Sequence, residues 1–177
     1  MATFHLSRRR KLWEGFLAGA CAGLTGTVAM TQFQNGWSKA ARALASKNDS
    51  NNQASEQGGE DATMKVAGAL AHLAGRQLSF QEKKRAGLAV HYAFGTLMGG
   101  VYGVVGEMSP RQVRRHAALS GVGLGSTLFV GADEIAVSKL GLSGGSAPLS
   151  SHIYGLVSHL VYGLATGLVY AQIRGKL

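Results

Sequence analysis

Four long apolar runs, separated by polar or basic stretches, organise this chain. Each run is about 21–22 residues long, and about 20 apolar helical residues are needed to cross the hydrocarbon core of a bilayer. The runs do not alternate polar and apolar residues as the strands of a membrane barrel would, so helices are predicted. We therefore expect an all-α integral membrane four-helix bundle, formed by a single domain of residues 1–177. The predicted spans are 12–33, 86–106, 117–137 and 152–173.

The polar segment 34–85 connects the first two predicted spans. Within it, the spacing of apolar residues over 60–74 predicts an amphipathic helix, with Asp61 near its start and Gly75 after its end. A helix of this kind is expected at the membrane interface, either flat on the surface or as a lid over the bundle.

Glycine is the most unusual feature of the composition, with 26 residues against only 2 prolines. An interior glycine costs a soluble helix about 0.5–1 kcal/mol relative to alanine, whereas in a bilayer small residues let helices approach closely. Small residues recur at every fourth position in the spans, which places them on one helix face. This pattern predicts helix packing through glycine, within the monomer or against other subunits. The packing residues are Gly15, Gly19, Gly23, Gly95, Gly99, Gly103, Gly121, Gly125, Gly163 and Gly167, and Gly123, Thr127 and Gly131 form a neighbouring stripe.

The basic residues lie in short clusters that border the apolar runs, although the net charge of +9 alone would also suit nucleic acid. Flanking clusters of this kind hold helix ends at anionic headgroups, so the lipid bilayer is the expected partner and nucleic acid is not. Four spans put both termini on one side of the membrane. The distribution of lysine and arginine leans towards cytoplasmic termini.

Five ionisable side chains inside the spans are candidates for function, because such residues are costly in a membrane. At about 1.5 Å per residue, they all fall in the half of the membrane that carries segment 34–85. His152 and His159 are seven residues apart and share one helix face. The cluster consists of His91, Asp133, Glu134, His152 and His159.

Several chemistries suit this cluster. Imidazole and carboxylate groups bind divalent metals such as zinc or iron, and they relay protons because histidine titrates near neutral pH. A histidine beside glycine also suits a haem or chlorin. The simpler alternative is that the pairs tie helices together. The sequence requires no cofactor, and its lack of a recognisable metal, phosphate or triad motif predicts a protein that is not an enzyme.

Two groups of residues near the ends of the spans are expected to have structural roles. Glu14 and Glu107 are expected to form ordinary ion pairs at the interface, on the side that carries Arg111–Arg115. Trp13, Tyr102 and Tyr170 are expected to anchor the helices at the headgroups.

Five phrases together resemble the YagU-like family of uncharacterised bacterial inner-membrane proteins. They cover much of the chain apart from its basic N-terminus and the Asn/Ser-rich loop. The resemblance implies a multi-pass protein of the bacterial inner membrane and supplies no catalytic mechanism. The phrases are GFLAGACAGL (15–24), ATMKVA (62–67), VHYAFGTLMGGVYG (90–103), GADEIAV (131–137) and LSSHIYGLVSHLVYGL (149–164).

These observations lead to three functional hypotheses. The first is a non-catalytic accessory or scaffold subunit of a larger membrane complex, or a homo-oligomer, because the chain is small and every span carries a glycine ladder. The second is a conduit for protons, metal ions or small solutes that uses the His/Asp/Glu cluster. The third is a haem- or chlorin-binding membrane subunit.

Overall fold

The computed structural model describes residues 2–48, 60–109, 116–131 and 149–176, which form helices and no strand. Five helices are defined in this part of the chain. They are α1 (Ala2–Asn48), α2 (Ala62–Leu73), α3 (Phe80–Met108), α5 (Ala117–Leu128), which continues into a π-helical turn over 129–131, and α6 (Leu149–Lys176).

Local capping explains why α2 and α3 form a helical hairpin. The Asp61 carboxylate accepts a hydrogen bond from the Met64 amide at 2.8 Å, so it caps the start of α2 as predicted. After α2 the chain turns at Gly75, whose φ of +73° favours glycine, and the Arg76 amide donates to the Ala71 carbonyl. Ser79 and Glu82 then form a capping box that starts α3. The predicted helix at 60–74 is thus confirmed as a helix.

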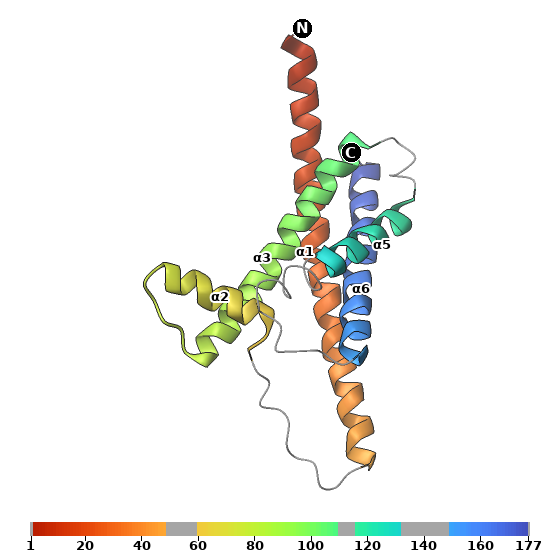
Figure 1. Cartoon of the computed structure of the whole chain (residues 1–177). Coiled ribbons are helices and arrows are strands. Elements are labelled where there is room, and N and C mark those ends of the chain that lie inside the picture. The colour runs from red at the N-terminus through yellow and green to blue at the C-terminus, as the bar shows by residue number, and fades with distance from the viewer. Residues whose placement is uncertain (1, 49–59, 110–115, 132–148, 177) are drawn as a thin grey trace.

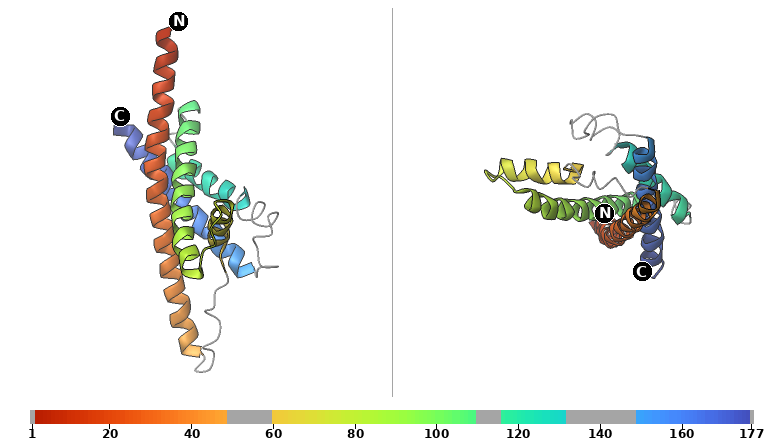
Figure 2. Two further views of the ribbon diagram at one scale, coloured as in Figure 1. Left: turned by 90° about the vertical axis from the view of Figure 1, so that its left-hand side faces the viewer. Right: turned by 90° about the horizontal axis from the view of Figure 1, so that it is seen from below.

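Helix α1 lies at the centre of the molecule (Figures 1 and 2). It packs against α3 and against α6, while α5 packs on α6 and crosses in front of it in Figure 1. Helix α2 packs on the first half of α3 and projects away from the other helices. Both ends of α1 extend beyond the helices that surround its middle.

Three helices are long and apolar enough to cross a membrane. They contain the candidate spans Arg10–Ala43, Phe80–Met108 and Leu149–Lys176, which include three of the four predicted runs. The other predicted run, 117–137, is apolar and helical over Ala117–Gly131, and its remainder lies outside the described residues.

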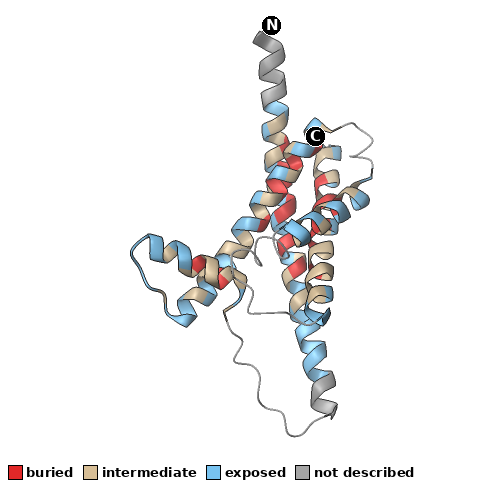
Figure 3. Ribbon diagram, viewed as in Figure 1, coloured by how far each residue is buried: buried red, intermediate tan, exposed pale blue. Residues whose placement is uncertain are grey.

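Buried residues gather where the long helices meet (Figure 3), and many of the exposed residues on these helices are large and apolar. On α3 the exposed residues Leu97, Val101 and Val105 form one stripe. Aromatic clusters lie towards the two ends of α1: Trp13 stacks on Phe16, and Trp37 packs against Tyr154. At about 1.5 Å per residue, Trp13 and Trp37 are about 36 Å apart along the helix, which fits a hydrocarbon core of about 30 Å with aromatic side chains at its interfaces.

Candidate functional site: a glycine-lined helix interface

Glycines bring the backbones of α1 and α3 into contact. Gly19 and Gly23 of α1 face Gly99 and Gly103 of α3, and no side chain separates the two helices there. A methyl group on Gly19 would lie 2.8 Å from the Cα of Gly103, and one on Gly23 would lie 2.7 Å from the Cα of Gly99. Real Cβ atoms do not approach so closely, so alanine at either position would push the helices apart.

The same kind of contact joins α5 to α6. Gly121 and Gly125 of α5 face Gly163 and Gly167 of α6. A methyl group on Gly163 would lie 2.9 Å from the Cα of Gly125, and one on Gly167 would lie equally close to the Cα of Gly121. The structure therefore contains two antiparallel helix pairs with glycine at the contact.

Tyrosines of α6 hold it against α3 at a constant register. The Tyr162 hydroxyl donates a 2.6 Å hydrogen bond to the carbonyl of Gly95, 67 residues earlier. The Tyr170 hydroxyl lies 3.1 Å from the carbonyl of Gly103, with the same separation of 67 residues. The two helices therefore run parallel, and the Tyr170 ring occupies the space that a side chain at Gly106 of α3 would need.

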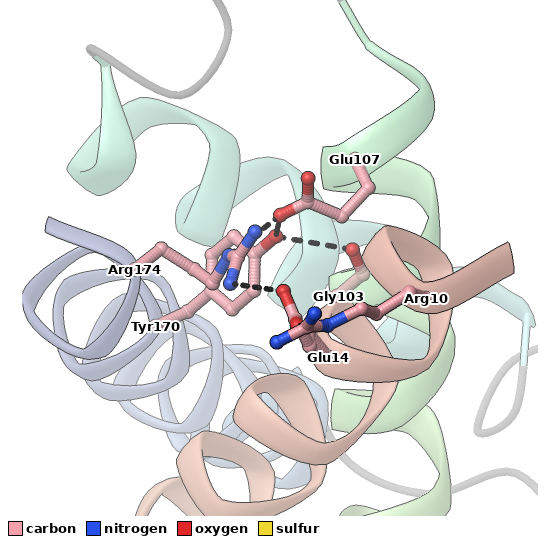
Figure 4. Close-up of polar contacts among 6 residues, drawn as sticks. All are labelled: Arg10, Glu14, Gly103, Glu107, Tyr170 and Arg174. Atoms are coloured by element: carbon pink, nitrogen blue, oxygen red, sulfur yellow. Dashed lines mark hydrogen bonds and ion pairs between the residues drawn. The ribbon is translucent and has the colours of Figure 1, made fainter. Parts of the chain in front are cut away.

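An ion-pair network closes one end of this interface (Figure 4). The Arg174 Nε donates to Glu107 Oε1 at 2.7 Å, and its Nη1 lies 3.6 Å from Glu14 Oε2. Tyr170 also donates to Glu107 Oε1 at 2.9 Å, and Arg10 bonds Glu14 from the outer side. The Glu107 side chain is only 4% exposed and that of Arg174 only 15%. This network ties α1, α3 and α6 together, and its central pair, Glu107 and Arg174, is largely out of water.

The network changes the roles expected for these side chains. Glu14 and Glu107 do form ion pairs, but both meet Arg174 of α6, and Glu107 is buried, so the pair is more than an ordinary surface contact. Tyr170 is 3% exposed, so the prediction that it anchors α6 at the headgroups is wrong. Trp13, by contrast, is largely exposed.

The two helix pairs are related by an internal repeat that is visible only once the contacts are known. Residues 91–102 (HYAFGTLMGGVY) and 159–170 (HLVYGLATGLVY) share a histidine, an aromatic residue followed by glycine, a second glycine, and Val-Tyr at the end. In both copies the two glycines face the preceding helix of the pair. His91 and His159 therefore occupy equivalent positions in α3 and α6.

The predicted polar cluster is brought together in part. His91 and His159 lie close enough to interact electrostatically, as do His91 and Asp61 of α2. The Nδ1 atom of His159 is 2.9 Å from the Gly155 carbonyl, and the His159 ring packs near Phe129 of the π-helical turn.

The Nε2 atom of His91 is buried and has no hydrogen-bond partner among the described residues. His152 lies in the first turns of α6, two turns before His159, and Asp133 and Glu134 lie outside the described residues. In the part of the chain that the structure describes, no group of three or more His, Cys, Asp or Glu side chains is placed to hold a metal ion.

Comparisons with known proteins add nothing to this description, because no protein-family model, curated protein or solved structure matches the chain. The resemblance to the YagU-like family therefore stays a prediction.

Proposed function

We propose that this chain is a multi-pass protein of the bacterial inner (cytoplasmic) membrane that acts by helix packing, as an accessory or scaffold subunit of a larger membrane complex or as a homo-oligomer. It has no catalysis of its own. Its four spans form a bundle packed through glycine ladders, α2 lies at the membrane interface, and both termini are cytoplasmic. Three helices with the length and composition of membrane spans support this placement.

The observation that carries the proposal is that some glycines along α5 contact another helix and others do not. Gly121 and Gly125 contact the backbone of α6, whereas no atom of the described residues lies within 4 Å of where side chains would begin at Gly123 and, in the π-helical turn that follows α5, at Gly131. An interior glycine is less favourable than alanine by about 0.5–1 kcal/mol, so two open glycines are a cost unless another backbone approaches them. Thr127 lies between them and donates its hydroxyl proton to the Gly123 carbonyl, which leaves the face without an unpaired hydroxyl group.

The composition of the interior points the same way. The residues with least exposure are small or hydroxylated, such as Ala22, Thr27, Ser158 and Thr166, and few large apolar side chains are buried. In lipid, helices associate through close packing and hydrogen bonds rather than through burial of large apolar groups. The same chemistry is available at the outer face of α5 for a further helix.

Purification of the tagged full-length protein in a mild detergent tests this proposal. The wild-type chain should carry a stoichiometric partner or form a homo-oligomer, and Gly123→Leu should lose it. Gly36→Leu also adds a side chain where no atom of the described residues lies within 4 Å, but it lies outside the predicted span 12–33, in the polar part of α1, and should keep the partner. A stable partner-free monomer in the wild type would contradict the proposal, and bound metal or haem or chlorin absorption in such a monomer would favour the alternatives.

One observation favours a second candidate, a conduit for protons, metal ions or small solutes. A buried histidine nitrogen without a partner is unusual, because buried polar atoms are normally hydrogen-bonded. His91 has such a nitrogen and lies near its equivalent, His159. Flux measured in proteoliposomes should then fall in His91→Ala, His159→Ala and Asp133→Asn and persist in the control His72→Ala, whose side chain is exposed on α2. Equal flux in all of these variants would remove this candidate.

A further inference from the structure

The turn between α2 and α3 projects from the molecule as an elbow, defined here as residues 70–85. Figures 1 and 2 place it away from α1, α5 and α6. The hairpin behind it is firmly packed. Met64 of α2 rests on Gly87 of α3, and the Lys83 side chain covers Gly68 and donates a 2.7 Å hydrogen bond to Glu60. The elbow is therefore a fixed projection of the fold.

The level of the elbow follows from the register of α1 against α3. Gly23 and Gly95 are in contact, and these helices run in opposite directions. Fifteen residues after Gly23, about 22 Å along the axis, α1 reaches Ser38. Fifteen residues before Gly95, at the same distance, α3 begins at Phe80. The elbow thus lies at the level of the aromatic cluster around Trp37 and Tyr154, where the membrane interface is placed.

Acidic side chains near the elbow are occupied within the hairpin. Glu60 pairs with Lys83, Asp61 caps α2, and Glu82 caps α3 by accepting from the amide and hydroxyl of Ser79. The cations Arg76, Lys84 and Arg85, by contrast, are exposed and have no ion pair among the described residues. Positive charge therefore faces outwards in excess, although Arg76 lies close enough to Glu82 to interact with its charge.

Large apolar side chains lie beside these cations. Leu73 is 84% exposed at the end of α2, and Phe80 is 51% exposed at the start of α3. Phe80 and Lys84 are four residues apart and share one face of α3. Exposed apolar groups next to unpaired cations are the combination with which proteins bind the surface of an anionic bilayer.

We propose that the elbow is a binding surface for acidic phospholipid headgroups, with Arg76, Lys84 and Arg85 at the phosphates and with Leu73 and Phe80 inserted among the first acyl carbons. This inference rests on the membrane placement proposed above. It specifies the class of lipid that the interfacial hairpin selects. Each basic residue near an anionic surface strengthens binding by about fivefold.

A solvatochromic dye on Leu73→Cys, in a Cys21→Ser background of the full-length protein, tests this proposal. In nanodiscs of phosphatidylcholine the emission should report water, and added phosphatidylglycerol should shift it to the blue. Replacing Arg76, Lys84 and Arg85 together by glutamine should raise the phosphatidylglycerol needed for half of the shift by about 100-fold, or abolish the shift. Lys39→Gln, an exposed cation on α1, should leave it unchanged.

Emission that is equal in both lipids, or a triple variant that responds like the wild type, would overturn the proposal. A shift seen only when a partner protein is added would do the same. A second dye position, Leu97→Cys in the exposed apolar stripe of α3, separates the two proposals. It should report hydrocarbon in every disc, and a report of water there would overturn the membrane placement as well.

Discussion

Single hydroxyl groups carry part of the contact between α6 and α3. The Tyr162 hydroxyl is buried against the Gly95 carbonyl, and the Tyr162 ring lies beside Gly95, where Thr27 of α1 also packs. A phenylalanine ring would fill the same volume without the hydrogen bond. The effect of this bond is therefore separable from packing.

Tyr162→Phe should lower the free energy of unfolding by about 1 kcal/mol, the usual net value of one hydrogen bond and within the range found between membrane helices. Unfolding followed by circular dichroism in mixed micelles measures it. Tyr92→Phe, a tyrosine of α3 without a hydrogen bond among the described residues, provides the control. A loss no larger for Tyr162→Phe than for Tyr92→Phe would show that the bond contributes nothing.

The buried carboxylate of Glu107 makes a stronger prediction. Removing Arg174 leaves Glu107 with its charge in a nearly dry site, and removing one partner of a buried pair costs about 3–5 kcal/mol. Arg174→Gln should therefore destabilise the protein by about 3 kcal/mol, and Glu107→Gln in the same chain should restore more than half of that loss. If the loss of unfolding free energy in the double variant equals the sum of the losses in the two single variants, the two side chains do not interact.

The sequence predicts these residue roles unevenly. Glycine spacing predicts packing positions, because a period of four is visible without a structure. The partner of Glu107 was not foreseen, since Arg174 is 67 residues away and looks like an ordinary flanking charge at the C-terminus. The wrong prediction for Tyr170 has a related reason: a tyrosine near a span end resembles an interfacial anchor, and only its contacts with Gly103 and Gly106 of α3 show that it points inwards.

At the scale of elements, the repeat makes the two helix pairs comparable. Gly99 of α3 and Gly167 of α6 are equivalent, and each meets the backbone of its neighbouring helix. Gly123 of α5 is also a glycine, but no atom of the described residues lies within 4 Å of where its side chain would begin. Substitutions at these three positions separate packing inside the chain from packing outside it.

Gly99→Leu and Gly167→Leu should each destabilise the isolated protein by about 1–3 kcal/mol or more, because the backbones must move apart to admit the side chain. Gly123→Leu should leave the stability of the isolated chain within about 0.5 kcal/mol of the wild type. Thermal unfolding in detergent compares the three. Equal losses at all three positions would mean that a glycine requirement is general to these helices and not due to the observed contacts.

Helix existence is well predicted at this scale, and helix ends are less so. The three long helices all extend beyond their predicted spans, because hydropathy marks the apolar part and not the polar turns that continue it. Capping explains the start of α3 at Phe80 instead of 86, since Ser79 and Glu82 are both polar. The repeat is hard to detect from the sequence because its two copies share only a few side chains, and their equivalence depends on which glycines face which helix.

At the scale of the whole molecule, the apolar surface and aromatic clusters define a membrane thickness. The chain has 2 tryptophans, one in each aromatic cluster of α1. Each can be observed alone in a variant with phenylalanine at the other position. The two variants report opposite interfaces if the placement is correct.

Both single-tryptophan variants, Trp13→Phe and Trp37→Phe, should be quenched most by lipids brominated near the headgroup, and less by lipids brominated near the ends of the acyl chains. Strongest quenching of either tryptophan by deep bromines would contradict the placement. Leu97→Trp, in a chain whose two native tryptophans are both replaced by phenylalanine, should show the opposite preference, because Leu97 lies in the exposed apolar stripe of α3.

The central claim is that this chain works by packing with other subunits, and native mass spectrometry directly from membrane vesicles tests it without detergent selection. The account predicts that the 18.4 kDa chain leaves the membrane in a complex, either with copies of itself or with a partner at a fixed ratio. The same measurement on Gly123→Leu should release the chain alone. A wild-type chain that always appears alone, with lipids as its only companions, would contradict the account.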